Sequence, residues 1–339
     1  MQESRRRLRT TSSIIRARLG FTGSKAAAGP YARPEKDAKV SGKSASKSAS
    51  SGTAARRHSI PGFSIVSKIG SGGTSIVFLA EEIHRNARKV ALKVLMPQKA
   101  LIPSELEKFR DEANLLIKFR HPNLVRGYHY AQYRGLHYLV LEHLNGKSVQ
   151  EIIKEKGALP EMDALDIILQ VSDALDYIEK QGILHRDIKP ENIVVLKDGT
   201  AKLCDLGYAQ KIVAGGGEEF NEVTSGTAHY MSPEQAMGKT NIDIRSDIYS
   251  LGATLYHMVM GELPYAGTDN MEVMAKHVLD ALNSPLIKNK GMSRHVHYFI
   301  ERMMAKDVNM RYSTPKELSE DIYEHLRGIY SIDHRQGLK

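Results

Sequence analysis

Residues 185–192, which read HRDIKPEN, bring three kinds of reactive group into one short stretch of chain. The carboxylate of Asp187 can orient a hydroxyl nucleophile and accept its proton. Lys189 can stabilise negative charge that develops on a phosphoryl group, and the amide of Asn192 can give an oxygen ligand to a metal ion. A His-Arg-Asp triplet alone is common, but the whole run is specific, and it predicts phosphoryl transfer to a hydroxyl.

A second candidate metal ligand follows a strand expected at residues 201–203. Asp205 begins an Asp-Leu-Gly triplet thirteen residues after Asn192, and Mg2+ prefers carboxylate oxygen as a ligand. An aspartate at a turn is by itself an ordinary feature.

Residues 70–77, which read GSGGTSIV, lie between two expected strands. Glycines lack a Cβ atom, so their backbone N–H groups can approach phosphate oxygens closely. The segment lacks the Gly-Lys-Ser/Thr ending of a Walker loop, and no helix is expected after it. Taken alone, it would be interpreted as an ordinary hairpin.

Lys93 lies in an expected strand between Leu92 and Val94. A lysine among apolar neighbours is partly desolvated and needs an anionic partner. The candidates are Glu112 and Asp111 on the one helix of this region. The two carboxylates lie about 100° apart around that helix, so only one of them can face Lys93.

The order of the expected elements is several short strands and one helix, followed by a mainly helical remainder after about residue 145. Residues 104–107 (SELE) resemble a capping box at the start of the first helix. A later stripe of apolar residues ends before Gly182 and predicts a second long helix; its members are Leu165, Ile168, Leu169, Leu175 and Ile178.

Together, over roughly residues 63–328, these motifs resemble the eukaryotic-type (Hanks-type) protein serine/threonine kinase family. Ser75 at the third glycine position and the run SPEQ at residues 232–235 are closest in style to bacterial members. The resemblance implies an α+β, bilobal fold, with a small antiparallel-sheet lobe that carries one helix and a larger, mainly helical lobe. Lys189 after Asp187 favours serine and threonine over tyrosine as acceptors.

The resemblance also implies ATP and Mg2+ as cofactors, with Mn2+ as an alternative, and proteins as substrates. Catalytic roles are implied for Asp187, Lys189, Asn192, Lys93 and Glu112, with Glu112 instead of Asp111 as the ion-pair partner of Lys93, and metal binding for Asn192 and Asp205. A hinge at residues 142–144 would bind adenine through backbone groups. Contacts with ATP are implied for Ile69, Gly70, Ser71, Gly72, Gly73, Thr74, Ser75, Val77, Ala91, Lys93, Leu141, Glu142, Leu144 and Val194.

Regulatory and structural roles follow from the same resemblance. Thr224 and Ser225 lie in an activation loop, where trans-autophosphorylation through a transient homodimer would raise activity, and Thr227 would contact the catalytic loop. Asp247 would anchor that loop, and Glu234 would pair with Arg311. Cys204 precedes Asp205 at the floor of the ATP site, where desolvation and like charge should raise the pKa of its thiol.

Charge is distributed very unevenly along the 339 residues. Residues 1–58 hold 14 Lys+Arg and 3 Asp+Glu, a net charge of +11, whereas the remainder holds 34 and 36, a net charge of −2. The first segment is rich in Ser, Ala and Gly and is expected to be disordered. We therefore expect a basic tail at 1–58, a kinase domain at 59–330 (small lobe about 63–141, hinge 142–146, large lobe 147–328) and a short tail at 331–339.

The tail leaves alternatives open: a solvated flexible segment, contact with acidic partners, or organelle targeting by residues 14–19. The single cysteine, Cys204, excludes an internal disulfide and fits a cytoplasmic location. No run of 18 apolar residues is present, so no transmembrane segment is expected. A pseudokinase scaffold or signalling adaptor is the alternative function, but every expected catalytic side chain is present.

Overall fold

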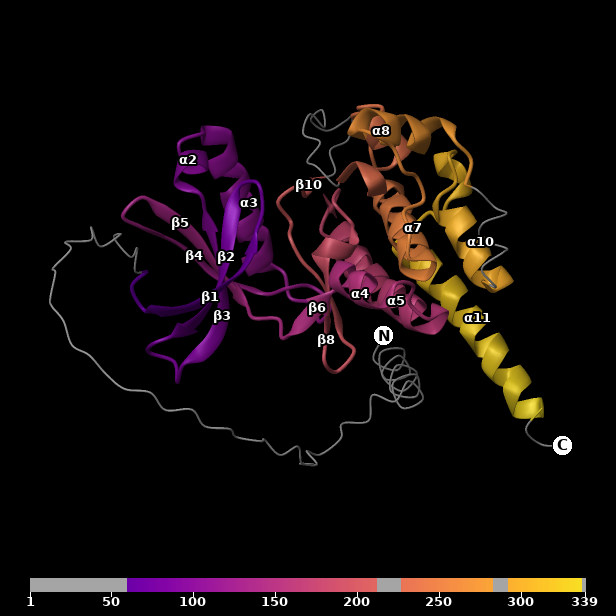
Figure 1. The fold of residues 1–339 in the computed structure, drawn as a ribbon, viewed down its shortest axis with the longest axis horizontal. Helices are drawn as coiled ribbons and strands as arrows, with labels where there is room; N and C mark the ends of the chain where they lie inside the picture. Colours follow the sequence, from indigo (N-terminus) through magenta and orange to yellow (C-terminus); the bar gives the residue numbers. More distant parts are fainter. Residues whose placement is uncertain (1–59, 212–226, 283–291, 337–339) are drawn as a thin grey trace, which may run out of the picture.

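The computed structural model describes residues 60–211, 227–282 and 292–336, and these form two lobes of different composition (Figure 1). The small lobe carries a five-stranded antiparallel sheet in the order β1-β2-β3-β5-β4. Its elements are β1 (Phe63–Ser71), β2 (Ser75–Glu82), β3 (Arg88–Leu95), α2 (Pro97–Ala100), α3 (Pro103–Lys118), β4 (Gly127–Tyr133) and β5 (Leu136–Glu142).

Alternation along β3 assigns its side chains to two separate apolar clusters. Ala91 and Leu95 pack in the main core with residues of α3, whereas Val90 and Leu92 pack in a smaller cluster on the other face of the sheet. Because side chains alternate between faces, Lys93 shares the face of Ala91 and Leu95. This register directs the lysine toward α3.

The expected capping box at residues 104–107 is wrong. Helix α3 begins earlier, with Pro103 in its first turn and Ile102 as the N-cap, and no side chain caps its first N–H groups. Proline fits the first helical turn because it has no N–H group to leave unsatisfied there. Ser104 therefore lies inside the first turn instead of preceding it.

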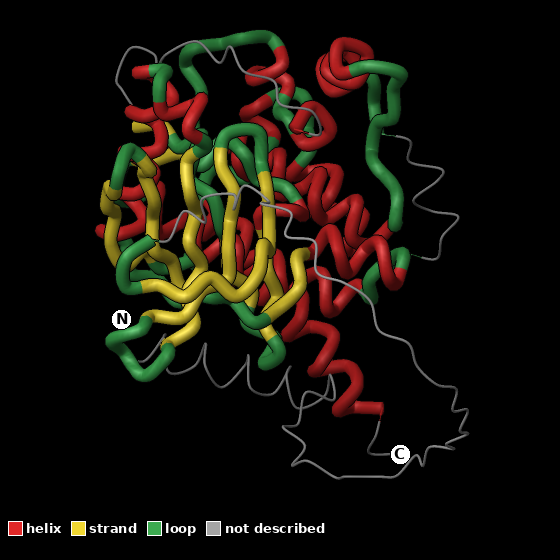
Figure 2. Tube along the Cα trace, turned by 60° about the vertical axis from the view of Figure 1, so that its left-hand side comes forward, coloured by secondary structure: helices red, strands yellow, loops and turns green. Residues whose placement is uncertain are grey.

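The large lobe is built mainly from helices (Figure 2). They are α4 (Val149–Lys156), α5 (Glu161–Glu179), α6 (Pro233–Ala236), α7 (Ile244–Met260), α8 (Asn270–Leu279), α10 (Arg294–Met303) and α11 (Pro315–Gln336). The short strands are β6 (Gly146–Ser148), β7 (Ile183–Leu184), β8 (Ile193–Leu196), β9 (Ala201–Leu203) and β10 (Gln210–Lys211), and the 3-10 turns are η1 (Pro190–Asn192), η2 (Thr227–Tyr230) and η3 (Val308–Met310).

Helix α7 lies at the centre of this lobe. Every one of its residues except Arg245 is buried, so it is apolar on more than one side, as a central helix requires. Helix α5 packs against both α7 and α11, and the five residues of its expected apolar stripe are all buried. The α+β, bilobal fold predicted from the sequence is confirmed.

In the described residues, no helix combines the length and the apolar character needed to cross a membrane.

Candidate active site

The loop after β7 brings Asp187, Lys189 and Asn192 together. One carboxylate oxygen of Asp187 accepts hydrogen bonds from Lys189 Nζ at 2.9 Å and from Asn192 Nδ2 at 2.9 Å. Asn192 Nδ2 also donates to the backbone oxygen of Asp187 at 2.8 Å. Burial raises the pKa of Asp187, although Lys189 opposes the rise. A carboxylate more basic than usual is suited to accepting a proton from a hydroxyl.

Asp247 of α7 holds the backbone of this loop. Its buried carboxylate accepts the N–H groups of His185 at 2.8 Å and of Arg186 at 2.7 Å. Arg186 has φ of 67°, a conformation that costs energy for a non-glycine residue. Gln235 Nε2 donates to the oxygen of Arg186 at 3.0 Å, and these three bonds hold the unusual turn.

Lys93, Glu112 and Asp205 form a second polar group. Lys93 Nζ lies 2.6 and 2.8 Å from the two carboxylate oxygens of Glu112 and 3.0 Å from Oδ1 of Asp205. Thus β3 supplies the cation, α3 supplies one carboxylate, and the segment after β9 supplies the other. Asp111, the rival partner, is exposed.

The three charges shift one another's pKa values. Burial alone would lower the pKa of Lys93, but Asp205 and Glu112 together raise it. Burial raises the pKa of Glu112 to about 7, with a contribution from Asp205 that Lys93 opposes. Partial desolvation would likewise raise the pKa of Asp205, but Lys93 holds it below its usual range. Asp205 is therefore the more fully charged of the two carboxylates.

The donor set suits a hard divalent cation. The side chain of Asp205 is 43% exposed and carries a negative charge, so a metal ion can reach it. A backbone hydrogen bond links the segment of Asp205 to Asn192, the second candidate ligand. The N–H of Cys204, the residue before Asp205, donates to the backbone oxygen of Asn192 at 2.8 Å. Within the described residues no group of three His, Cys, Asp or Glu side chains converges. Two protein ligands match Mg2+, which usually completes its shell with water and phosphate oxygens.

Some of the residues expected to bind ATP lie around the turn between β1 and β2, and others lie on or beside the strands β2, β3, β5 and β8. Residues 69–75 lie at the end of β1 and in the turn to β2, where Gly72 N donates to Ser75 O at 2.9 Å. A Cβ atom on Gly72 or Gly73 would meet nothing within 4 Å, so this turn borders open space. Ala91 of β3 pairs in register with Leu141 of β5.

Three further residues complete the expected adenine site. Val77 and Leu144 pack against the same apolar core as Ala91 and Leu141, and Val194 lies in β8. The geometry is compatible with a nucleotide between the lobes, and the role of each residue toward ATP stays a prediction.

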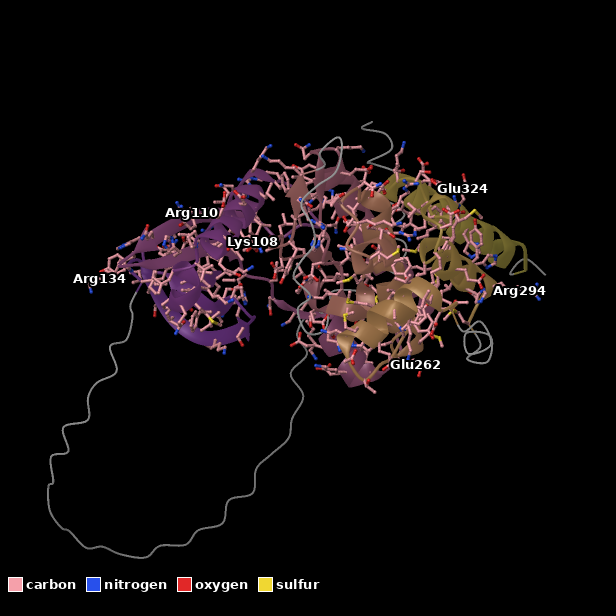
Figure 3. All side chains as sticks on the ribbon, turned by 90° about the horizontal axis from the view of Figure 1, so that it is seen from above. Lys108, Arg110, Arg134, Glu262, Arg294 and Glu324 are labelled. Carbon is pink, nitrogen blue, oxygen red and sulfur yellow. The ribbon has the colours of Figure 1, made fainter. Side chains whose placement is uncertain are left out.

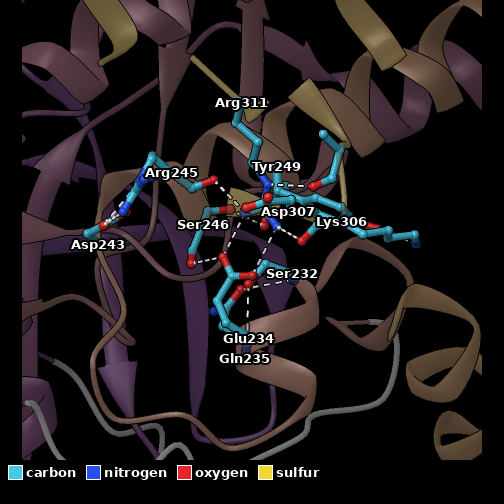
Figure 4. A network of polar contacts seen from close by, with 12 residues as sticks. Ser232, Glu234, Gln235, Asp243, Arg245, Ser246, Tyr249, Lys306, Asp307 and Arg311 are labelled. Atoms are coloured by element: carbon cyan, nitrogen blue, oxygen red, sulfur yellow. Dashed lines mark hydrogen bonds and ion pairs between the residues drawn. The ribbon is translucent and has the colours of Figure 1, made fainter. Parts of the chain in front are cut away.

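Glu234 and Arg311 form a buried, bidentate ion pair (Figure 4). The two N···O distances are 2.7 and 3.0 Å, and Ser246 donates a further hydrogen bond to Glu234. Arg311 also donates to the oxygens of Ala305 and Arg245, at 2.8 and 3.0 Å. The pair connects α6 to the residues before α11.

Two side-chain roles were missed by the sequence reasoning. Gln235 ends the SPEQ run, and neither the bacterial style of that run nor the role predicted for Glu234 indicates that the side chain of Gln235 supports Arg186. The hinge was expected to act through its backbone alone, but the carboxylate of Glu142 accepts from Lys202 Nζ at 2.9 Å and from Arg126 N at 3.2 Å. No periodicity or motif marks these long-range contacts.

Thr224 and Ser225 lie outside the described residues, as does the whole basic tail. Thr227 begins η2, directly before the described side chains of the segment that leads to α6.

Comparison with known proteins agrees with this geometry. The model of the protein kinase domain matches residues 63–324. The chain is 36% identical over 260 residues to a probable serine/threonine-protein kinase of Clostridium perfringens, a match that covers 77% of this chain and 38% of that protein. It is 34% identical over 258 residues to the serine/threonine-protein kinase PknB of Mycobacterium leprae, covering 75% and 41%. This chain spans about two fifths of the length of these relatives. The family match over residues 63–324 and these relatives, in agreement with the arrangement of Asp187, the Lys93–Glu112 pair and Asp205, establish that the chain belongs to the protein kinase family of the Hanks type.

Proposed function

We propose that this protein is an ATP-dependent protein serine/threonine kinase, which transfers the γ-phosphoryl group of ATP to a hydroxyl of a protein substrate. The observation that carries the proposal is the carboxylate of Asp187 held between Lys189 and Asn192. The names of the related kinases of Clostridium and Mycobacterium support serine and threonine as acceptors.

Each residue has a distinct task in the proposed reaction. Asp187 orients the substrate hydroxyl and accepts its proton, which its raised pKa favours. Lys189 neutralises charge on the transferring group, and Lys93, kept in position by Glu112, binds the α- and β-phosphates. Mg2+, or alternatively Mn2+, bound by Asn192 and Asp205 would supply further neutralisation of the phosphates.

Regulation by autophosphorylation belongs to the same proposal. Phosphate on Thr224 or Ser225 would carry about two negative charges and would need a cationic partner. Arg186 is a candidate; its side chain donates to Gln210 in β10. A transient homodimer would present the activation loop of one copy to the active site of another.

The remaining expectations are proposed on sequence grounds. Residues 1–58, with a net charge of +11, would form a solvated basic tail whose charge suits acidic partners, and residues 59–330 would form the kinase domain. The single cysteine supports a reducing compartment such as the cytoplasm.

Analysis of the reaction products tests this proposal. The purified chain would be incubated with ATP, Mg2+ and peptides that offer serine, threonine or tyrosine. Phosphate on serine or threonine, with mass-spectrometric sites at Thr224 or Ser225, supports the proposal. Phosphate on tyrosine alone, or ATP hydrolysis without any phosphorylated protein, contradicts it.

A further inference from the structure

A pocket of about 360 Å³ lies behind the hinge, between the two lobes. Its walls come from the loop after α3, the start of β4, the end of β5 and β9, and they include Phe119, Arg120, Arg126, Tyr128 and Lys202. Glu142 is the only lining residue that also belongs to the expected ATP site. The pocket is therefore separate from the site of phosphoryl transfer.

The charges around this pocket are predominantly positive. Arg120, Arg126 and Lys202 face one carboxylate, that of Glu142, which Lys202 and the backbone of Arg126 already engage. Both arginines are exposed, and neither has a carboxylate within ion-pair distance among the side chains that the structure describes, those of residues 60–211, 228–282 and 292–326. By contrast, Arg88 pairs with Glu82 and Arg311 pairs with Glu234.

The two unpaired guanidinium groups are held in place by other contacts. Arg120 donates to the oxygens of Ile117 and, at 2.7 Å, Phe119 at the end of α3. The guanidinium of Arg126 lies 5.6 Å from the centre of the Tyr128 ring. These contacts satisfy part of each side chain but leave its charge uncompensated, and they restrict its motion.

Backbone bonding makes the pocket a preformed unit. Leu203, next to Lys202, accepts from Val125 N at 2.9 Å and donates to Asn123 O at 2.8 Å. The side chain of Asn123 donates to the oxygen of Ala201 at 2.8 Å. The wall from the small lobe is thus bonded to β9 of the large lobe. A site held in this way loses little conformational entropy when a ligand binds.

We propose that this pocket is a binding site for a phosphate group, recognised by the exposed Arg120 and Arg126 and by the largely buried Lys202. Guanidinium groups form charge-assisted, bidentate hydrogen bonds with phosphate oxygens. The rings of Phe119 and Tyr128 offer an apolar wall for the carbon atoms that carry the phosphate. The group belongs either to a small phosphorylated molecule or to a phosphorylated peptide. The proposal is independent of catalysis.

Calorimetric titration of the full chain tests the site. Inorganic phosphate, phosphoserine and a phosphoserine peptide would each be titrated at constant ionic strength, with ADP and Mg2+ saturating the nucleotide site. Arg120→Gln and Arg126→Gln are expected to weaken binding about 5-fold or more, because each removes one charge-assisted contact. Arg134→Gln is the matched control: Arg134 is also exposed, stacks on a tyrosine of β4 at 5.2 Å, and lies at the outer edge of the small lobe (Figure 3).

Saturable binding of any of the three probes that both test variants weaken and the control does not would support the site. Equal affinity for phosphate and for the peptide would identify a small phosphorylated ligand, and much tighter binding of the peptide would identify a phosphorylated segment. The proposal is overturned if none of the probes saturates below about 20 mM. It is also overturned if Arg134→Gln weakens binding as much as the other two variants, since that result indicates non-specific charge attraction.

Discussion

Nζ of Lys93 lies 2.6 Å from a carboxylate oxygen of Glu112, across the boundary between the sheet and the helix of the small lobe. The side chains are only 10% and 3% exposed, so little solvent screens the pair. The same Nζ also contacts Asp205, which connects the pair to the segment that follows β9 in the large lobe. Three segments far apart in the sequence must therefore be in place together for the site to be complete.

Removal of the charge on Glu112 should weaken the placement of ATP. We expect Glu112→Gln to lower kcat/KM for ATP about 10- to 100-fold, equivalent to roughly 1.4 to 2.8 kcal/mol of transition-state stabilisation. Steady-state kinetics would measure this change. Asp111→Asn, at the exposed neighbouring position, is the control and should retain the wild-type value. Wild-type kinetics in Glu112→Gln would show that the ion pair has no role in catalysis.

The pKa of Glu112 predicts a pH dependence of the same parameter. Burial raises this pKa to about 7, so Glu112 takes up a proton as the pH falls through 7 and loses its charge. The kcat/KM for ATP should accordingly fall on the acid side of pH 7 in the wild type. Glu112→Gln should lack this part of the profile. An identical acid limb in both proteins would assign it to another group.

The Glu234–Arg311 pair should contribute strongly to stability because the side chain of Arg311 is fully buried. Breaking such a pair from one side leaves an uncompensated charge, so we expect Arg311→Met to lower the free energy of unfolding by about 3 to 5 kcal/mol. Chemical denaturation would measure the loss. Lys316→Met, which removes one partner of the exposed Lys316–Glu320 pair, should change it by about 0.5 kcal/mol or less. Similar effects of the two substitutions would contradict the assignment.

Asp173 of α5 should destabilise the protein near neutral pH. Burial, with help from Asp176, raises its pKa to about 6 from the ordinary 3.8. The folded state then retains a proton that the unfolded state has released, so this contribution to stability is complete below pH 3.8 and is lost as the pH rises through 6. At pH 7.5 the free energy of unfolding of Asp173→Asn should be about 1 to 2 kcal/mol higher than that of the wild type. Equal stability of both proteins at pH 7.5 would disprove the shift.

Cys204 should react slowly despite its position beside the active site. Burial, together with the charge of Asp205, raises the pKa of its thiol to about 12, so almost no thiolate exists at pH 7.5. Small thiol reagents should modify it slowly, an ATP-site ligand with an electrophile should label it over a longer time, and excess ATP should protect it. Cys204→Ala should keep most activity. Rapid labelling that ATP does not affect would place Cys204 outside the nucleotide site.

Much of the fold was predictable because its signals are local. The apolar stripe of α5 and the apolar character of α7 on several sides are direct consequences of helical periodicity. The start of α3 was not predicted correctly. A Ser-x-x-Glu pattern directly after Pro103 resembles a capping box, but the helix begins at Pro103 itself. Short motifs also identified Lys93 and Glu112 as partners.

Contacts that depend on packing of distant segments carried no such signal. Gln235 and Arg186 are separated by 49 residues, and only the folded lobe shows that one supports the other. The same holds for Lys202 and Glu142, which are 60 residues apart and meet behind the hinge. A charged residue in a strand or at a hinge indicates by itself neither its partner nor the pocket that it lines.

The most direct test of the proposed activity is phosphoryl transfer by Asp187→Asn compared with the wild type, measured as single turnovers with saturating ATP and Mg2+. Asparagine keeps the size of the side chain but cannot accept the proton of the hydroxyl. The rate should fall about 100- to 10,000-fold while the Kd for ATP stays within about 3-fold of the wild-type value. Transfer by Asp187→Asn at the wild-type rate would contradict the role of Asp187 and with it the proposed mechanism.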